Sequence, residues 1–315
     1  MRPSWEKITS EGQAMKKTEL MLLAALFAWI TCGPAMAGPV VMYGGLGGHA
    51  AGGGSTNDGA LVTVDQATAA TTLVGHPAGV ARLTGIAFDA DGSLFGSTLG
   101  AIPYPPPPSP STSKLILINP DTGALISTIG PIVDGPNGPA ISIDDLAMQP
   151  GTDVLFGIRS EIDGLGGAGK LYAINKASGV ATLVGNTGHV FGSIAFAPTG
   201  TLYLSAADLG AMGPTNASLK ILNPVSAAVV SSVPTANFFG ALGVRPTDGV
   251  VFGGEGDNGK IATVNPVTGA ETLLSGTTGQ NFVGDLDFLV VPEPAALGIV
   301  AVGIAVTLPR PRRRP

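Results

Sequence analysis

The stretch Lys114–Gly123 reads KLILINPDTG, and four further stretches of the chain repeat its pattern. They are ALVTVDQATA at 60–69, KLYAINKASG at 170–179, SLKILNPVSA at 218–227 and KIATVNPVTG at 260–269. In each stretch apolar residues alternate up to an Asn or Asp, and a turn rich in Pro, Thr, Ser and Gly follows. This pattern predicts a strand that ends in a turn capped by the Asn or Asp side chain.

A second series of repeats lies between the first. It comprises LTGIAFDADGSLFGS from Leu83, DDLAMQPGTDVLFGI from Asp144, FGSIAFAPTGTLYLS from Phe191 and FGALGVRPTDGVVFGG from Phe239. Each predicts two strands joined by a turn that contains Gly, and a short strand after each Asn turn brings the number to four per repeat. Successive repeats are 42 to 56 residues apart. Four-stranded units at this spacing are typical of a β-propeller.

The two ends of the repeated region complement one another. The last repeat stops after one strand, FVGDLDFLV from Phe282, and the region begins with a lone strand, VVMYG from Val40. We therefore expect an all-β chain with five four-stranded blades, in which the N-terminal strands complete the last blade and close the ring. The alternatives are an irregular six-bladed propeller and a pair of β-sandwiches.

These repeats resemble exported propellers whose blades carry a strand, a PDG-like turn, an LY strand and an ID-x-x-TG strand. That superfamily has lactonase-like and surface-layer-like members, and the resemblance covers nearly all of residues 39–290. It implies a fold rather than an activity.

The N-terminal residues 1–37 have the pattern of a cleavable leader. Lys16 and Lys17 precede an apolar stretch, and Ala35, Met36 and Ala37 form the small-x-small site that signal peptidase accepts, with cleavage before Gly38. The start of translation is either Met1 or Met15. The only cysteine, Cys32, lies in this leader, so the mature chain has no disulfide and no cysteine metal site.

The C-terminal residues 291–315 combine three features in order. Pro292, Glu293 and Pro294 precede an apolar stretch, which ends in a basic tail that contains Arg312, Arg313 and Arg314. This resembles the PEP-CTERM sorting signal, which implies recognition by an exosortase in Gram-negative bacteria that often make exopolysaccharide. The apolar stretch can enter a membrane, with the arginines on the cytoplasmic side. A tail anchor that is never cut is the alternative.

The middle of the chain, residues 38–290, holds 8 basic and 18 acidic residues. A nucleic acid is therefore an unfavourable partner, because its affinity for proteins comes largely from Lys and Arg that neutralise phosphates. The sequence also contains no Gly-x-Ser-x-Gly, no His-Glu-x-x-His and no phosphate-binding loop with Lys. It favours a protein that is not an enzyme.

Candidate site residues fall near the expected axis of the ring. Asp145 and Asp285 occupy equivalent places on strands expected to line the channel, and Asp287 interrupts a series of small residues there. Carboxylates gathered near an axis need a cation or protons, so these three are candidate ligands for a hard cation such as calcium. His76 and His189 precede innermost strands in two blades and are candidates for the face that binds a ligand.

The sequence as a whole predicts an exported, exosortase-processed propeller that acts as a binding or structural module at the cell surface or in the extracellular matrix. Its expected partners are signal peptidase, the exosortase, and either exopolysaccharide or another surface protein. Membrane contact is expected only through the C-terminal sorting segment. The alternative is an extracytoplasmic metal-dependent hydrolase of the lactonase-like kind, with Asp145, Asp285 and Asp287 as ligands.

Overall fold

The computed structural model describes residues 38–47, 57–99, 112–159, 169–210, 213–255, 259–280 and 283–291. These residues form strands, turns and loops, with no helix among them, so the described part of the chain contains no helix able to cross a membrane. Residues 40–291 form one compact unit. The sorting residues Pro292 to Arg314 and the leader residues Ala35 and Ala37 lie outside the described ranges.

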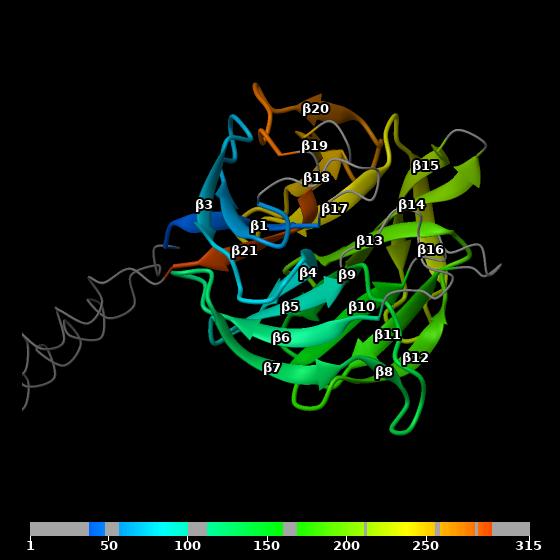
Figure 1. Ribbon diagram of the computed structural model, residues 1–315. Coiled ribbons are helices and arrows are strands. Elements are labelled where there is room, and N and C mark those ends of the chain that lie inside the picture. The colour runs from blue at the N-terminus through cyan, green and yellow to red at the C-terminus, as the bar shows by residue number, and fades with distance from the viewer. Residues whose placement is uncertain are drawn as a thin grey trace, which may run out of the picture. The chain divides into compact units, whose positions relative to one another are not determined.

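The strands assemble into five sheets, and each sheet contains four antiparallel strands that run from the inside of the ring to its outside (Figure 1). The first blade contains β4 (Arg82–Phe88), β5 (Leu94–Leu99), β6 (Lys114–Ile118) and β7 (Leu125–Pro131). The second contains β9 (Asp145–Gln149), β10 (Val154–Arg159), β11 (Lys170–Ile174) and β12 (Val180–Asn186). A short strand, β8 (Val133–Asp134), extends this sheet by pairing in parallel with β12.

The third blade contains β13 (Phe191–Phe196), β14 (Leu202–Gly210), β15 (Gly213–Leu222) and β16 (Val229–Pro234). The fourth contains β17 (Phe239–Val244), β18 (Val251–Glu255), β19 (Lys260–Val264) and β20 (Glu271–Leu273). The fifth combines both ends of the unit, with β21 (Val283–Val290) innermost, then β1 (Val40–Leu46), β2 (Leu61–Val64) and β3 (Thr71–Gly75). The prediction of five blades closed by the N-terminal strands is confirmed, which excludes six blades and the sandwich pair.

Closure of the ring rests on an extended antiparallel ladder between β1 and β21. Val40 pairs with Val290 at one end of this ladder and Leu46 pairs with Val283 at the other. The innermost strands contact one another in the order β21, β4, β9, β13 and β17, and β17 returns to β21. The ring is therefore continuous at its axis.

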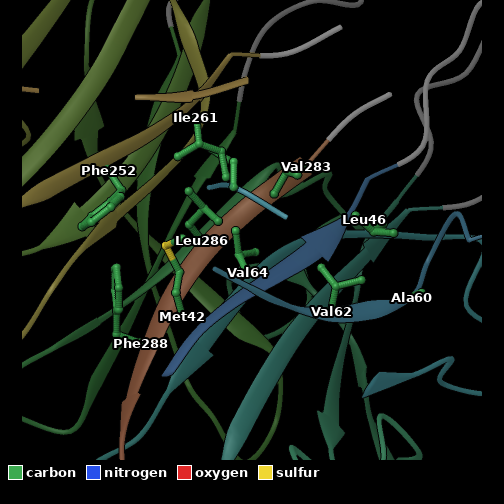
Figure 2. Close-up of a cluster of buried hydrophobic side chains, with 12 residues drawn as sticks. Met42, Leu46, Ala60, Val62, Val64, Phe252, Ile261, Val283, Leu286 and Phe288 are labelled. Atoms are coloured by element: carbon green, nitrogen blue, oxygen red, sulfur yellow. The ribbon is translucent and has the colours of Figure 1, made fainter. Parts of the chain in front are cut away.

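The fourth and fifth blades meet through a buried apolar cluster that includes residues from both ends of the unit (Figure 2). Met42 and Val62 come from the N-terminal strands, whereas Leu286 and Phe288 come from β21. Across the blade boundary the ring of Phe288 lies 5.5 Å from that of Phe252, centroid to centroid. Burial of these side chains links ring closure to the hydrophobic driving force of folding.

The repeated Asn or Asp motif forms the same capped turn in every blade. In the first blade Asn119 Oδ1 accepts hydrogen bonds from the backbone N–H groups of Asp121 and Thr122, and Gly123 N–H donates to the carbonyl of Asn119. Counted with the Asn or Asp as the first residue, the fifth residue of the turn has a positive φ in every blade. This residue is Ala69, Gly123, Gly179, Ala227 or Gly269. The capping predicted from the sequence is confirmed.

These turns also seal each blade against the outermost strand of the preceding one. A Cβ built on Gly123 would lie 2.5 Å from the Cα of Gly75, which ends β3 in the fifth blade. A Cβ on Gly269 would lie 1.9 Å from the carbonyl oxygen of Pro234, which ends β16 in the third blade. Glycine at the end of the motif thus allows both the left-handed backbone and the close approach of two main chains.

Candidate functional site

The innermost strands carry three of the predicted site residues. Asp145 begins β9, and Asp285 and Asp287 lie on β21. Each innermost strand is an edge strand of its sheet. The backbone N–H groups on its unpaired edge therefore need acceptors outside that sheet. Carboxylates on the neighbouring blade are suited to accept such bonds.

Asp145 and Asp285 each join their own blade to the next one around the ring. Asp145 Oδ2 accepts a 2.7 Å hydrogen bond from the N–H of Ile194 on β13, and Asp285 Oδ2 accepts a 2.6 Å bond from the N–H of Ile86 on β4. The other oxygen of each carboxyl accepts from the following residue's N–H, that of Leu146 or Leu286. The side chains are thus structural links between blades.

The same two carboxyls also meet each other. They lie on β9 and β21, strands that are both neighbours of β4, and a hydrogen bond joins their side chains. Both residues are 0% exposed. Burial, followed by the charge of Asp145, raises the pKa of Asp285 well above its ordinary range, and burial raises the pKa of Asp145 likewise. A bond between two carboxyl groups requires a proton on one of them.

Asp287 lies apart from this pair and makes its own link to the first blade. Its Oδ2 accepts a 2.6 Å hydrogen bond from the N–H of Phe88, and its Oδ1 accepts from the N–H of Phe288 at 2.8 Å. Burial raises the pKa of Asp287 to about 7, against the lowering effect of these two bonds. The raised pKa favours the protonated form of this carboxyl at mildly acidic pH.

The geometry of these three carboxyls bears on the predicted calcium site. The structure brings Asp145 and Asp285 into contact but bonds Asp287 to a separate amide, and each carboxyl already accepts two backbone hydrogen bonds. In the described part of the chain no group of three or more His, Cys, Asp or Glu side chains is arranged to hold a metal ion. Calcium binding remains a prediction that awaits measurement.

The two candidate histidines have separate, local partners. His76 Nε2 lies 2.5 Å from the carbonyl oxygen of Asp58, and its Nδ1 lies 3.2 Å from that of Pro77. His189 Nδ1 lies 3.1 Å from Asp208 Oδ1. No interaction found among the described residues joins the two histidines, and each is part of its own loop.

Asp208 forms a further polar centre, which the sequence pattern does not predict. Its Oδ2 accepts a 3.2 Å hydrogen bond from Asn216 Nδ2, across the long hairpin formed by β14 and β15. The hydrogen bond with His189, followed by that with Asn216, lowers the pKa of Asp208. This contact is not predictable from the sequence, because the partners come from a loop and from two strands whose extension past the blade carries no repeat signal.

Comparison with known proteins adds little to this description. No protein-family model matches the sequence, and a search of curated proteins finds no match. Among solved structures the chain is similar to one described as "Crystal structure of Nidogen/Laminin Complex", with a TM-score of 0.48 and 11% identity. The match covers 81% of this chain and 100% of that one. The propeller fold is shown by the five sheets and by their closure into a ring.

Proposed function

We propose that this protein is an exported, exosortase-processed propeller that serves as a binding or structural module at the cell surface or in the extracellular matrix. Signal peptidase would cut before Gly38, and the exosortase would act at Pro292, Glu293 and Pro294. The domain left between these sites is the five-bladed ring.

One observation carries the proposal. The ring closes through β1, which begins at Val40, and β21, which ends at Val290. Both proposed processing sites therefore lie just outside the ladder that closes the fold, and removal of the flanking segments would leave every pair of that ladder in place. Such an arrangement suits a protein that is cut at both ends and must stay folded afterwards.

The acidic excess of residues 38–290 supports the same reading. A net negative surface keeps a module soluble in an extracellular polymer and repels nucleic acid. Exopolysaccharide or another surface protein is the proposed partner class.

Mass spectrometry of the cell envelope and the culture medium tests the processing. We expect a mature chain that begins at Gly38 and lacks peptides that contain Arg312 to Arg314. In a Glu293→Ala variant the arginine tail should persist, whereas the exposed-site control Asp121→Ala should be processed like the wild type. Detection of the arginine tail in the mature wild-type protein would contradict the proposal.

A further inference from the structure

His76 lies at the boundary between the fifth and first blades. It belongs to the segment that leads from β3 in the fifth blade to β4 in the first, and this segment packs against the residues just before β2. The packing is close, because a Cβ built on Gly59 would overlap the carbonyl oxygen of Val80. The histidine therefore bridges two parts of the chain that meet where the ends of the propeller unit are joined.

Both ring nitrogens of His76 face main-chain carbonyl oxygens. Nε2 lies 2.5 Å from the oxygen of Asp58, and Nδ1 lies 3.2 Å from that of Pro77. A carbonyl oxygen only accepts hydrogen bonds, so each of these contacts needs an N–H on the ring. Neutral imidazole carries one N–H and imidazolium carries two. Only the protonated ring can therefore donate to both oxygens at once.

The shorter contact selects the tautomer of the neutral ring. At 2.5 Å the Nε2 atom must carry the proton, because two lone pairs at that distance would repel one another. In this tautomer the lone pair of Nδ1 faces the oxygen of Pro77, and that contact has no hydrogen bond. A second proton turns Nδ1 into a donor, and it also strengthens the bond to Asp58, because hydrogen bonds from a charged donor are stronger.

The two carbonyl oxygens belong to different parts of the boundary. The oxygen of Pro77 also accepts from the N–H of Val80, which closes a turn just before β4, and Val80 is buried in an apolar cluster that contains residues of both blades. Asp58 precedes β2, and the next residue, Gly59, donates its N–H to the end of β1. A protonated His76 thus ties the turn before β4 to the hairpin of β1 and β2.

The titratable side chains on the elements packed against His76 differ in sign. They are Tyr43 on β1, Asp58 before β2, Arg82 on β4 and Asp121 in the capped turn that contacts Gly75. The two aspartates favour a positive charge on the ring, whereas Arg82 opposes it. The difference between the two protonation states of the ring therefore comes chiefly from the two carbonyl oxygens that it touches.

We propose that His76 is a pH-sensitive clamp between the fifth and first blades, in which the imidazolium donates to the carbonyl oxygens of Asp58 and Pro77 together. Loss of one proton to solvent opens the bond to Pro77. The clamp is closed in mildly acidic surroundings, because an ordinary histidine takes up its second proton near about pH 6.5, and it loosens above neutrality. The clamp does not depend on export or on exosortase processing.

The sign of the effect on stability follows from proton binding. The folded chain gains a hydrogen bond when His76 is protonated and the unfolded chain does not, so acid favours the folded state. This added stability is fully present below the pH range in which an ordinary histidine titrates, and it is lost as the pH rises and the folded chain releases the proton. One added hydrogen bond changes the unfolding equilibrium constant by about twofold to tenfold.

Denaturant unfolding of the purified full-length chain between about pH 5.5 and about pH 8 measures this effect. The matched variant is His76→Gln, whose amide group can donate to Asp58 but takes up no proton. The ratio of its unfolding equilibrium constant to that of the wild type should rise by about twofold to tenfold from the higher pH to the lower. Other titrating groups, Asp287 among them, contribute to both chains and cancel in the ratio.

An Asp58→Asn background separates the carbonyl oxygen from the carboxylate of the same residue. The substitution removes the negative charge and keeps the main-chain oxygen that Nε2 contacts. The rise in the ratio should persist in this background. Its disappearance would assign the effect to the carboxylate and overturn the proposal.

NMR of the His76 ring nitrogens in the wild type gives a readout that does not depend on how a variant folds. We expect protons on both nitrogens at about pH 5.5 and on Nε2 alone at about pH 8. A neutral ring that carries its proton on Nδ1 would overturn the proposal, because Nε2 could not then donate to Asp58. A ratio of equilibrium constants that stays flat across the pH range would overturn it as well.

Discussion

The close main-chain contact between Gly123 in the first blade and Gly75 in the fifth can be tested with a Gly123→Ala substitution. Gly123 has φ = 67°, and an added Cβ would lie 2.5 Å from the Cα of Gly75. The left-handed backbone alone costs about 1 kcal/mol for a residue with a Cβ. The clash is with main chain, which cannot turn away as a side chain can, so overpacking adds about 1–3 kcal/mol.

Gly151 provides the matched control. It has φ = 73°, and a Cβ there would meet no atom within 4 Å. Gly151→Ala should therefore show the backbone cost without the clash. For a domain of this size 1 kcal/mol corresponds to about 2–4 °C in Tm. Gly123→Ala should melt at least about 2 °C below Gly151→Ala, measured by circular dichroism in the same buffer. Equal melting temperatures would refute the close main-chain contact between these blades.

Three further outcomes are expected. The wild type should lose up to about 4 kcal/mol of stability as the pH rises from about 4 to about 7, because the raised pKa of Asp287, about 7, keeps a proton in the folded state that the unfolded state has lost. Asp287→Asn should not show this loss. Superimposable pH profiles of variant and wild type would count against it. Deleting Val40–Gly75 removes three strands of the fifth blade and should abolish cooperative unfolding, and a soluble fragment with an unchanged Tm would disprove the closure. Lys176→Met should cost about 1 kcal/mol at low salt through loss of its bonds to Asp89 and Asp153, with a smaller cost in high salt, and a Tm that does not respond would exclude that link between blades.

The number of blades was predictable because each blade contains a recognisable copy of the same sequence repeat. Each Asn or Asp followed four residues later by Gly or Ala forms the same capped turn, and the alternating strands before it fix which side chains are buried. The lone strand at Val40 and the single last strand at Phe282 required a partner, and each supplied one for the other. Local pattern and ring symmetry together were sufficient for the architecture.

The candidate site was only partly predictable. The equivalent places of Asp145 and Asp285 on innermost strands could be aligned, but their mutual hydrogen bond depends on how far two blades that are not neighbours lie from each other across the axis. Asp287, two residues from Asp285, was grouped with the pair, whereas its carboxyl bonds to the N–H of Phe88. β8 was missed as well, because two residues in a loop carry no periodicity.

The ladder between β1 and β21 also affects how the chain can fold while it is being synthesised. Its partners are roughly 240 residues apart in the sequence, and a ribosome adds about 5–20 residues per second. The first three strands therefore wait about 12 to 50 seconds for the strand that completes their sheet. Over that interval the inner edge of β1 is a template open to any passing strand, including one from another nascent copy. Pairing of β1 with such a strand would compete with closure of the ring.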